Sequence, residues 1–241
     1  MCGIYATNFP FTENEIRTKL KAIEFRGPDY TGVLKKDKLS FGHLRLSILD
    51  LDVRSNQPMQ MEDFIIVFNG EIYNFQEIKG ELISLGHTFN TTGDTEVLLK
   101  GFIEWGQAVV PKLNGMFAFA IHDKINNILF CSRVRLGVKP FYYYWKDGMF
   151  EICSQLKPIS ENKTINNEAV SIYLDCTYIP SPYSIYNDVY KLPPGNNLII
   201  DLGNKRYKVE EYWNLKPVIP SNLSYEEAVE KVHDLFEDAV R

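Results

Sequence analysis

The sequence predicts an α+β domain that is rich in strands, flanked by helices and large enough to bury a sizeable core. Three observations support this class. The chain has 241 residues, 45% hydrophobic and 24% charged, which is an ordinary globular composition. Several segments repeat apolar residues at helical spacing behind a capping residue, the first of them after Thr12. Between 115 and 154 the pattern changes to successive strand-like runs separated by turn-forming residues.

The first elements follow from local spacing. Residues 2–6 suit a strand, and Thr12 with Glu15 forms a capping box for a helix whose apolar face carries Ile16, Leu20 and Ile23. The Arg-Gly-Pro-Asp run at 26–29 ends that helix. Residues 31–50 predict paired strands, and their alternation places Arg45 on the face opposite Leu44, Leu46 and Ile48.

The middle of the chain predicts a buried strand followed by two helices. The strand at 64–68 is expected to end in a turn at Asn69-Gly70. Asn74 and Glu77 begin a capped helix with an apolar face of Ile78, Leu82 and Leu85. Asp94 stands where the N-cap of the next helix belongs, so capping is the default explanation for its carboxylate.

The second half predicts hairpins, a short helix near 168–175 and a distinct tail. The paired runs are 116–121 with 128–132, 140–145 with 149–153, and 198–201 with 207–213. Residues 217–222 read as a linker before a helix capped by Ser224, with an apolar stripe of Ala228, Val232, Leu235 and Ala239. We interpret this helix as the start of a truncated second domain; docking back onto the first domain fits the periodicity equally well.

Bulk properties exclude several classes of protein. The net charge of −5 argues against a nucleic-acid partner, and no apolar run is long enough to span a membrane. The N-terminus lacks the pattern of a secretory signal. The cysteines are widely spaced and form no zinc pattern, so a reducing, cytoplasmic setting is expected; they are Cys2, Cys131, Cys153 and Cys176.

Cys2 is the residue whose position suggests reactivity. If Met1 is removed, one residue carries both a thiol nucleophile and a free α-amine, whose usual pKa of roughly 7.7–8.0 suits a general base. The alternative is that Cys2 simply starts an edge strand. Taken singly, Arg45 suits a solvated strand position, and His43 is more often a satisfied structural group than a catalyst.

Six motifs occur in an order that resembles one family. They are Cys-Gly-Ile at 2–4, Arg-Gly-Pro-Asp at 26–29, Gly-His-Leu-Arg-Leu-Ser-Ile at 42–48, Asn-Gly-Glu-Ile-Tyr-Asn at 69–74, Thr-Gly-Asp-Thr-Glu at 92–96 and Gly-Met-Phe-Ala-Phe-Ala at 115–120. Together they resemble the glutaminase domain of the class II, N-terminal-nucleophile glutamine amidotransferases. Within that group the chain looks like the asparagine synthetase B type, and the resemblance covers about residues 1–240.

The resemblance implies the fold and the domain organisation. It implies a four-layer αββα sandwich of two antiparallel sheets, the Ntn-hydrolase fold. Residues 1–213 would form the glutamine amidotransferase type 2 domain. Residues 214–241 would be the linker and first helix of a C-terminal synthetase domain.

The same resemblance implies hydrolysis of L-glutamine to glutamate and ammonia. Cys2 would attack the side-chain amide and form a γ-glutamyl thioester that water then opens. The side-chain amide of Asn69 and the backbone N–H of Gly70 would form the oxyanion hole, where one donor is typically worth about 10²–10³ in rate.

The amino-acid end of the substrate would be held by charge. By resemblance, Arg45 binds the α-carboxylate, a task suited to its planar fork. Asp94 would hold the α-ammonium with help from Glu71, and backbone groups of Leu46 and Ile48 would line the same pocket. No cofactor or metal is expected in this domain.

The expected partners are glutamine and the synthetase domain of the same chain; a homodimer is compatible with the resemblance. That domain would use ATP and Mg to amidate a carboxylate, usually aspartate, although relatives also amidate sugar acids. Its Ser-Gly-Gly-x-Asp-Ser loop is absent from these residues, so this segment is expected to bind no ATP.

Two departures from the family pattern leave other interpretations open. Val134 and Gln155 stand where the family usually carries acids, and neither maps to the glutamine pocket. They favour a catalytically silent regulatory module only slightly. The glutaminase half of a phosphoribosyl or hexosamine amidotransferase is a second alternative, which the motifs at 26–29 and 42–47 oppose.

Overall fold

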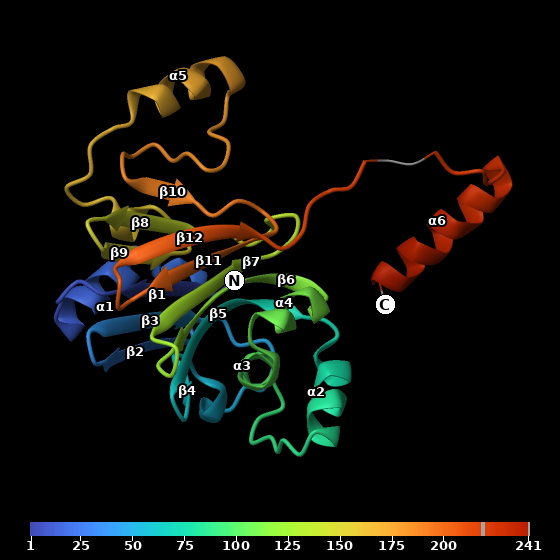
Figure 1. Cartoon of the computed structure of the whole chain (residues 1–241), viewed down its shortest axis with the longest axis horizontal. Coiled ribbons are helices and arrows are strands. Elements are labelled where there is room, and N and C mark those ends of the chain that lie inside the picture. Colours follow the sequence, from blue (N-terminus) through green and yellow to red (C-terminus); the bar gives the residue numbers. More distant parts are fainter. Residues whose placement is uncertain (218–219, 241) are drawn as a thin grey trace.

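The computed structural model describes residues 1–217 and 220–240, and two six-stranded sheets form its centre (Figure 1). The first sheet has the order β10 (Val189–Lys191), β8 (Tyr142–Lys146), β9 (Met149–Cys153), β1 (Gly3–Thr7), β3 (Leu39–Arg45) and β2 (Tyr30–Lys36). The second has the order β12 (Arg206–Glu211), β11 (Asn196–Asp201), β7 (Ile128–Arg133), β6 (Gly115–Asp123), β5 (Phe64–Ile72) and β4 (Met59–Met61). Every strand pairing is antiparallel.

The helices in the first half of the chain lie on the outer faces of the two sheets. The α-helices are α1 (Glu13–Lys21), α2 (Phe75–Ser84), α3 (Asp94–Trp105), α4 (Val109–Lys112), α5 (Asn167–Cys176) and α6 (Tyr225–Val240). Short 3₁₀ segments are η1 (Glu24–Arg26), η2 (Val53–Ser55), η3 (Gly106–Ala108) and η4 (Lys157–Ile159). In Figure 1, α2, α3 and α4 gather beside β5 and β6, whereas α1 lies beside β1 and β3.

Alternation along β5 shows how the layers are built. Ile65 and Val67 pack into the core between the two sheets, whereas Ile66 and Phe68 pack into the core under α2 and α3. A third core joins α1 to the outer face of the first sheet and contains Ile16, Leu20, Tyr5 and Leu44. The layer order is therefore helix, sheet, sheet, helix, which confirms the αββα sandwich and the α+β class.

Most local predictions are confirmed. Thr12 and Glu15 form both bonds of the capping box, with Thr12 N donating to Glu15 Oε2 at 2.7 Å and Glu15 N donating to Thr12 Oγ1 at 3.3 Å. The three hairpins form as β6–β7, β8–β9 and β11–β12. The turn between β8 and β9 has positive φ at Asp147 and Gly148, as a tight hairpin turn requires.

The prediction of a turn at Asn69-Gly70 is wrong. β5 continues to Ile72, with Asn69 opposite Ala118 and Gly70 opposite Phe117 on β6. A Cβ on Gly70 would lie 2.3 Å from the carbonyl oxygen of Met116, so this glycine permits close approach of two strands. The pairing with β6 overrides the local turn signal.

The strand expected to reach residue 50 also ends earlier. β3 stops at Arg45 because its partner β2 begins at Tyr30, and the Asp29 carboxylate accepts the Ser47 N–H at 2.7 Å in place of a ladder bond. Leu46 is half-buried and Ile48 is 59% exposed, so the alternation expected there does not continue.

The two expected caps at Asn74 and Asp94 differ from the prediction. Asn74 occupies the N-cap of α2, but its side chain contacts the Lys112 carbonyl and the Asn114 N–H instead. Gly93 occupies the N-cap of α3, and Asp94 is the first helical residue. The Asp94 carboxylate accepts the N–H of Ile72 at 2.9 Å, which joins the start of α3 to the end of β5.

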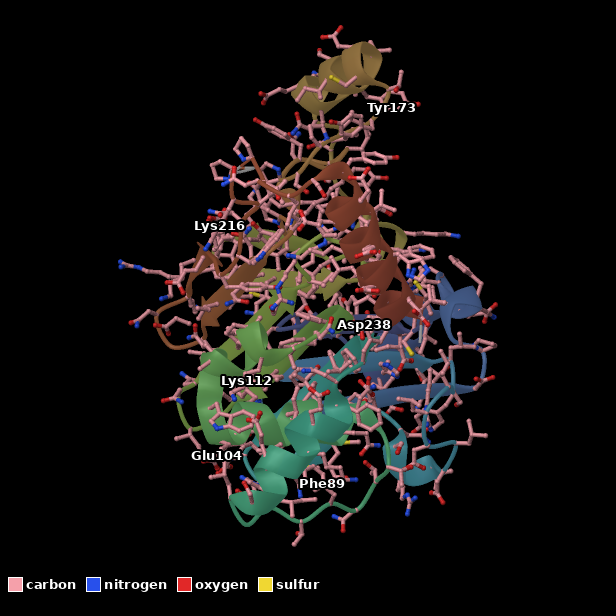
Figure 2. All side chains as sticks on the ribbon, turned by 90° about the vertical axis from the view of Figure 1, so that its right-hand side faces the viewer. Phe89, Glu104, Lys112, Tyr173, Lys216 and Asp238 are labelled. Atoms are coloured by element: carbon pink, nitrogen blue, oxygen red, sulfur yellow. The ribbon has the colours of Figure 1, made fainter. Side chains whose placement is uncertain are left out.

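Two segments extend from the sandwich. The predicted helix near 168–175 is α5, which buries Ala169, and Figure 2 shows Tyr173 on it, far from the sheets. α6 begins at the predicted Ser224 box, with Glu227 N donating to Ser224 Oγ at 3.2 Å, and buries no residue. The assignment of this helix to a second domain stays a prediction. Of the predicted linker 217–222, residues 218–219 lie outside the described residues.

Candidate active site

One pocket brings together the chain segments that the sequence singled out. It has a volume of about 430 Å³ including its open mouth, and lies among the start of β1, the end of β3, the middle of β5 and the start of α3. Seven of the predicted site residues line it, namely Cys2, Arg45, Leu46, Ile48, Gly70, Glu71 and Asp94. The eighth, Asn69, is buried directly beside Gly70.

Cys2 is held at the start of β1 by its neighbours on both sides. The Leu46 N–H lies 3.4 Å from Cys2 Sγ and donates to it, and the Leu46 carbonyl lies 3.7 Å from the same atom. Arg26 Nε donates to the Cys2 carbonyl at 2.9 Å. Burial raises the pKa of the thiol, and the Leu46 N–H opposes that rise by stabilising the thiolate.

The amine that the mechanism requires depends on Met1. While Met1 precedes Cys2, the nitrogen of Cys2 belongs to a peptide bond. Met1 is 52% exposed, and Cys2 is half-buried. Partial burial lowers the pKa of the Met1 amine, and the charges of Arg26 and Lys139 act in the same direction.

Asn69 is buried with an unsatisfied side chain. It is 1% exposed, and neither Oδ1 nor Nδ2 has a hydrogen-bond partner among the described residues. Buried amides are usually paired because an unpaired one costs on the order of 1–3 kcal/mol. A free amide donor beside the Gly70 N–H is the arrangement that an oxyanion hole requires.

The strand that carries Asn69 is fixed from both sides by buried groups. Gln57 Oε1 accepts the Phe68 N–H at 2.6 Å, and His43 Nε2 lies 3.0 Å from the Phe68 carbonyl. Burial lowers the pKa of His43 to about 4, so the ring is neutral and donates to this carbonyl through Nε2. His43 therefore links β3 to β5 as the structural group that its sequence context suggested.

Arg45 points into the pocket from the end of β3, but its terminal nitrogens are already engaged. Nη1 donates to the Asp52 carbonyl at 3.0 Å and to Asn56 Oδ1 at 2.7 Å. Nη2 donates to the carbonyls of Leu49 and Asp50. The guanidinium thus shapes the 49–56 loop, and a substrate carboxylate would meet it from its Nε side or displace loop acceptors.

Two acids that line the pocket, Asp94 and Glu71, influence each other's charge. Burial raises the pKa of Asp94 to about 6, and burial together with the Asp94 charge raises that of Glu71 to about 7. Such a pair is a poor neighbour for a further anion and a good one for an ammonium group. These shifts fit the clamp that the resemblance implies for the α-ammonium end.

Three residues near the pocket were not singled out by sequence reasoning. Gln57 bridges Phe68 to Thr95, donating through Nε2 to Thr95 Oγ1 at 3.2 Å. Lys139 is 4% exposed; burial lowers the pKa of its ammonium, and the charges of Glu71 and Cys2 oppose that shift. Asp50 accepts the Thr92 N–H with its carboxylate and a hydrogen bond from Arg45 Nη2 with its carbonyl. The Gly-x-Lys-Pro run at 137–140 was a usable signal for Lys139, whereas Gln57 and Asp50 carry no local signal.

The two departures from the family pattern lie away from this pocket. Val134 is 4% exposed within the core under α2 and α3, where an unpaired carboxylate would be costly. Gln155 lines a separate surface groove with Ser154 and Tyr142. Neither lines the pocket around Cys2, as the sequence analysis expected.

Within residues 1–217 and 220–240, no helix combines the length and apolar character needed to cross a membrane. In the same residues, no cluster of three or more histidine, cysteine or acidic side chains is placed to hold a metal ion.

Comparison with known proteins gives a consistent family. A family model described as a glutamine amidotransferase domain matches residues 1–213. A Methanocaldococcus jannaschii protein, provisionally named a glutamine-hydrolyzing asparagine synthetase, is 39% identical over 273 residues, covering 100% of this chain and 52% of that protein. Asparagine synthetase (glutamine-hydrolyzing) 3 of Bacillus subtilis is 34% identical over 224 residues, covering 89% of this chain and 36% of that protein.

Among solved structures, the chain is similar to glutamine phosphoribosylpyrophosphate amidotransferase from B. subtilis, with a TM-score of 0.65 and 18% identity. The match covers 88% of this chain and 49% of that one. At this identity the likeness shows the fold alone, an Ntn-hydrolase sandwich. The chain spans about half or less of the length of the relatives it matches.

Proposed function

From the premise that this chain belongs to the class II glutamine amidotransferase family, we propose that it hydrolyses L-glutamine through Cys2. The observation that carries this proposal is the unpaired, buried Asn69 amide next in sequence to Gly70, which lines the same pocket as Cys2. A free donor at that place fits the developing oxyanion of amide hydrolysis.

The proposed reaction has two steps. After removal of Met1, the α-amine of Cys2 takes the thiol proton, and Sγ attacks the side-chain carbonyl carbon of glutamine. The oxyanion is stabilised by the Asn69 side-chain amide and the Gly70 N–H. The C–N bond then breaks, the amine returns its proton to the leaving nitrogen, and ammonia departs. Water adds to the γ-glutamyl thioester, releases glutamate and restores the thiol.

The amino-acid end of glutamine is proposed to bind between Arg45 and the acids Asp94 and Glu71. Ionised carboxylates are needed to hold the α-ammonium, and their raised pKa values fall once that cation is present. Leu46 and Ile48 line the same pocket, where their backbone groups are proposed to contact the substrate. This arrangement selects a free amino acid over a simple amide, because a simple amide has no zwitterionic end.

We further propose that the ammonia feeds an ATP-dependent synthetase domain outside these residues, with aspartate as the first acceptor to test. The support is the naming of relatives that extend well beyond this chain. ATP and Mg would bind there, since these 241 residues contain no Ser-Gly-Gly-x-Asp-Ser loop. A sugar acid is the alternative acceptor. A cytoplasmic setting is proposed for a chain with free cysteines.

Glutamate release by the Met1-free chain tests the proposal. Wild type should release glutamate, Cys2→Ala should release none above background, and Cys176→Ala, which removes an exposed free thiol, should behave as wild type. The electrophile diazo-oxo-norleucine should label Cys2, located by peptide mass spectrometry. Equal glutamate release from wild type and Cys2→Ala would refute catalysis by Cys2, and an unlabelled, inactive chain with Met1 removed would indicate a silent module.

A further inference from the structure

One buried carboxylate connects the two walls of the pocket. Asp50 Oδ2 accepts the N–H of Thr92 at 2.7 Å and pairs with Arg54 Nε at 3.2 Å, and its side chain is 3% exposed. Thr92 lies 42 residues further along the chain, two residues before Asp94. The contact therefore ties the loop after β3 to the segment that begins α3.

The same residue contacts Arg45 through its backbone. The Asp50 carbonyl accepts a hydrogen bond from Arg45 Nη2, beside the bonds that Nη1 makes to Asp52 and Asn56. Asp50 thus contacts the Arg45 guanidinium through its carbonyl and Thr92, two residues before Asp94, through its carboxylate. Among the described residues, Asp50 is the one that we find hydrogen-bonded both to Arg45 and to the segment just before Asp94.

The backbone of Asp50 is held in an uncommon conformation to do this. Its φ is 43°, in the left-handed region that residues other than glycine seldom adopt. A Cβ on Gly93 would lie 3.7 Å from the Cβ of Asp50, so the two segments are in packing contact.

We propose that Asp50 is a positioning residue that sets the spacing between Arg45 and Asp94, and thereby the affinity for the amino-acid end of glutamine. This inference rests on the proposed function. The carboxylate and ammonium of an amino acid share one carbon, so their two partners must be placed to within about 0.5 Å. Hydrogen bonds from the Thr92 N–H and from the Ser55 and Arg54 side chains hold the pKa of Asp50 below its usual range, so the link remains ionised near neutral pH.

The test uses the Met1-free chain with Asp50→Asn, which removes the charge but keeps the shape. KM for glutamine should rise on the order of tenfold with kcat nearly unchanged, the pattern of lost substrate binding. Labelling of Cys2 by diazo-oxo-norleucine should require a correspondingly higher concentration. Alkylation of Cys2 by iodoacetamide, which has no amino-acid end, should proceed at the wild-type rate. Asp63→Asn, an acid on the β4–β5 turn, is the matched control and should leave every value unchanged.

Each outcome decides the inference. A wild-type KM in Asp50→Asn overturns it, and so does a parallel loss of kcat and iodoacetamide reactivity, which would mean general disruption of the site. If Asp50→Asn does not fold, Asp50→Glu decides by the same comparison: a raised KM with kcat retained supports the spacing role, and an unchanged KM overturns it. Absence of glutamate release and of labelling in the wild type would refute the proposed function, and the Asp50 inference with it.

Discussion

Replacing Asn69 by alanine separates what this residue does for catalysis from what it does for stability. Removing a buried polar side chain usually destabilises the fold because it breaks internal hydrogen bonds. Here neither Oδ1 nor Nδ2 has a partner among the described residues, so truncation breaks no internal hydrogen bond. The side chain is nevertheless the proposed donor to the oxyanion. Activity and stability should therefore respond to Asn69→Ala in different ways.

The expected magnitudes follow from this accounting. Loss of one oxyanion donor typically lowers kcat by about 10²–10³, or about 2.7–4 kcal/mol of transition-state free energy. Removing an unsatisfied buried amide relieves a desolvation cost of about 1–3 kcal/mol. The lost packing of the side chain opposes that gain and is of similar size. The free energy of unfolding should consequently stay within about 1 kcal/mol of wild type.

The assay measures glutamate release and urea unfolding on the same preparation. Asn197→Ala is the matched control, because Asn197 is also buried with an unpaired Oδ1 but lies on β11, away from Cys2. It should leave kcat unchanged. An unaltered kcat in Asn69→Ala would refute the oxyanion role. A loss of stability well beyond that range would show that the amide has a structural partner in the folded protein.

Three other predictions concern the same framework. Gly70→Ala should lower the free energy of unfolding by about 3 kcal/mol in urea titration, because the new Cβ would lie 2.3 Å from the carbonyl oxygen of Met116. An acid whose pKa is raised on folding stabilises the fold most at low pH, where it is protonated. Because the pKa is about 6 for Asp94 and about 7 for Glu71, the free energy of unfolding should fall as the pH rises from about 4 to about 7. Asp94→Asn should make that fall smaller. Thr12→Ala should cost about 1 kcal/mol with no change in glutamate release, since only a helix cap is lost.

Sequence patterns were sufficient where structure depends on neighbouring residues. The Thr12 capping box and the hairpin turn at Asp147-Gly148 each need only a few consecutive residues, and both form. The layered sandwich was different, because periodicity predicted strands and helices without their stacking order. That order came from the resemblance, since the pairing of β1 between β3 and β9 joins segments that lie far apart in the chain.

The failures share one physical cause. Asn69-Gly70 reads locally as a turn, but nine residues of β5 pair with β6 and their ladder bonds outweigh the preference of two residues. Asp94 reads as a cap, but its carboxylate reaches the Ile72 N–H, 22 residues earlier in the sequence. Contacts of this kind leave no trace in local spacing. The same is true of Gln57, whose partner Thr95 is 38 residues away.

The pocket gathers groups that make the fold less stable, and the position of the pocket explains why the fold tolerates them. Asn69 is unpaired and Asp94 is an acid that burial disfavours. Asn69 lies near the end of β5 and Asp94 begins α3, whereas the core between the sheets is filled largely by apolar side chains. A rigid sandwich can therefore hold strained or unsatisfied groups in fixed places. A bound glutamine would pair these groups at once, so the cost present in the free protein becomes selectivity for a ligand with an amide, a carboxylate and an ammonium.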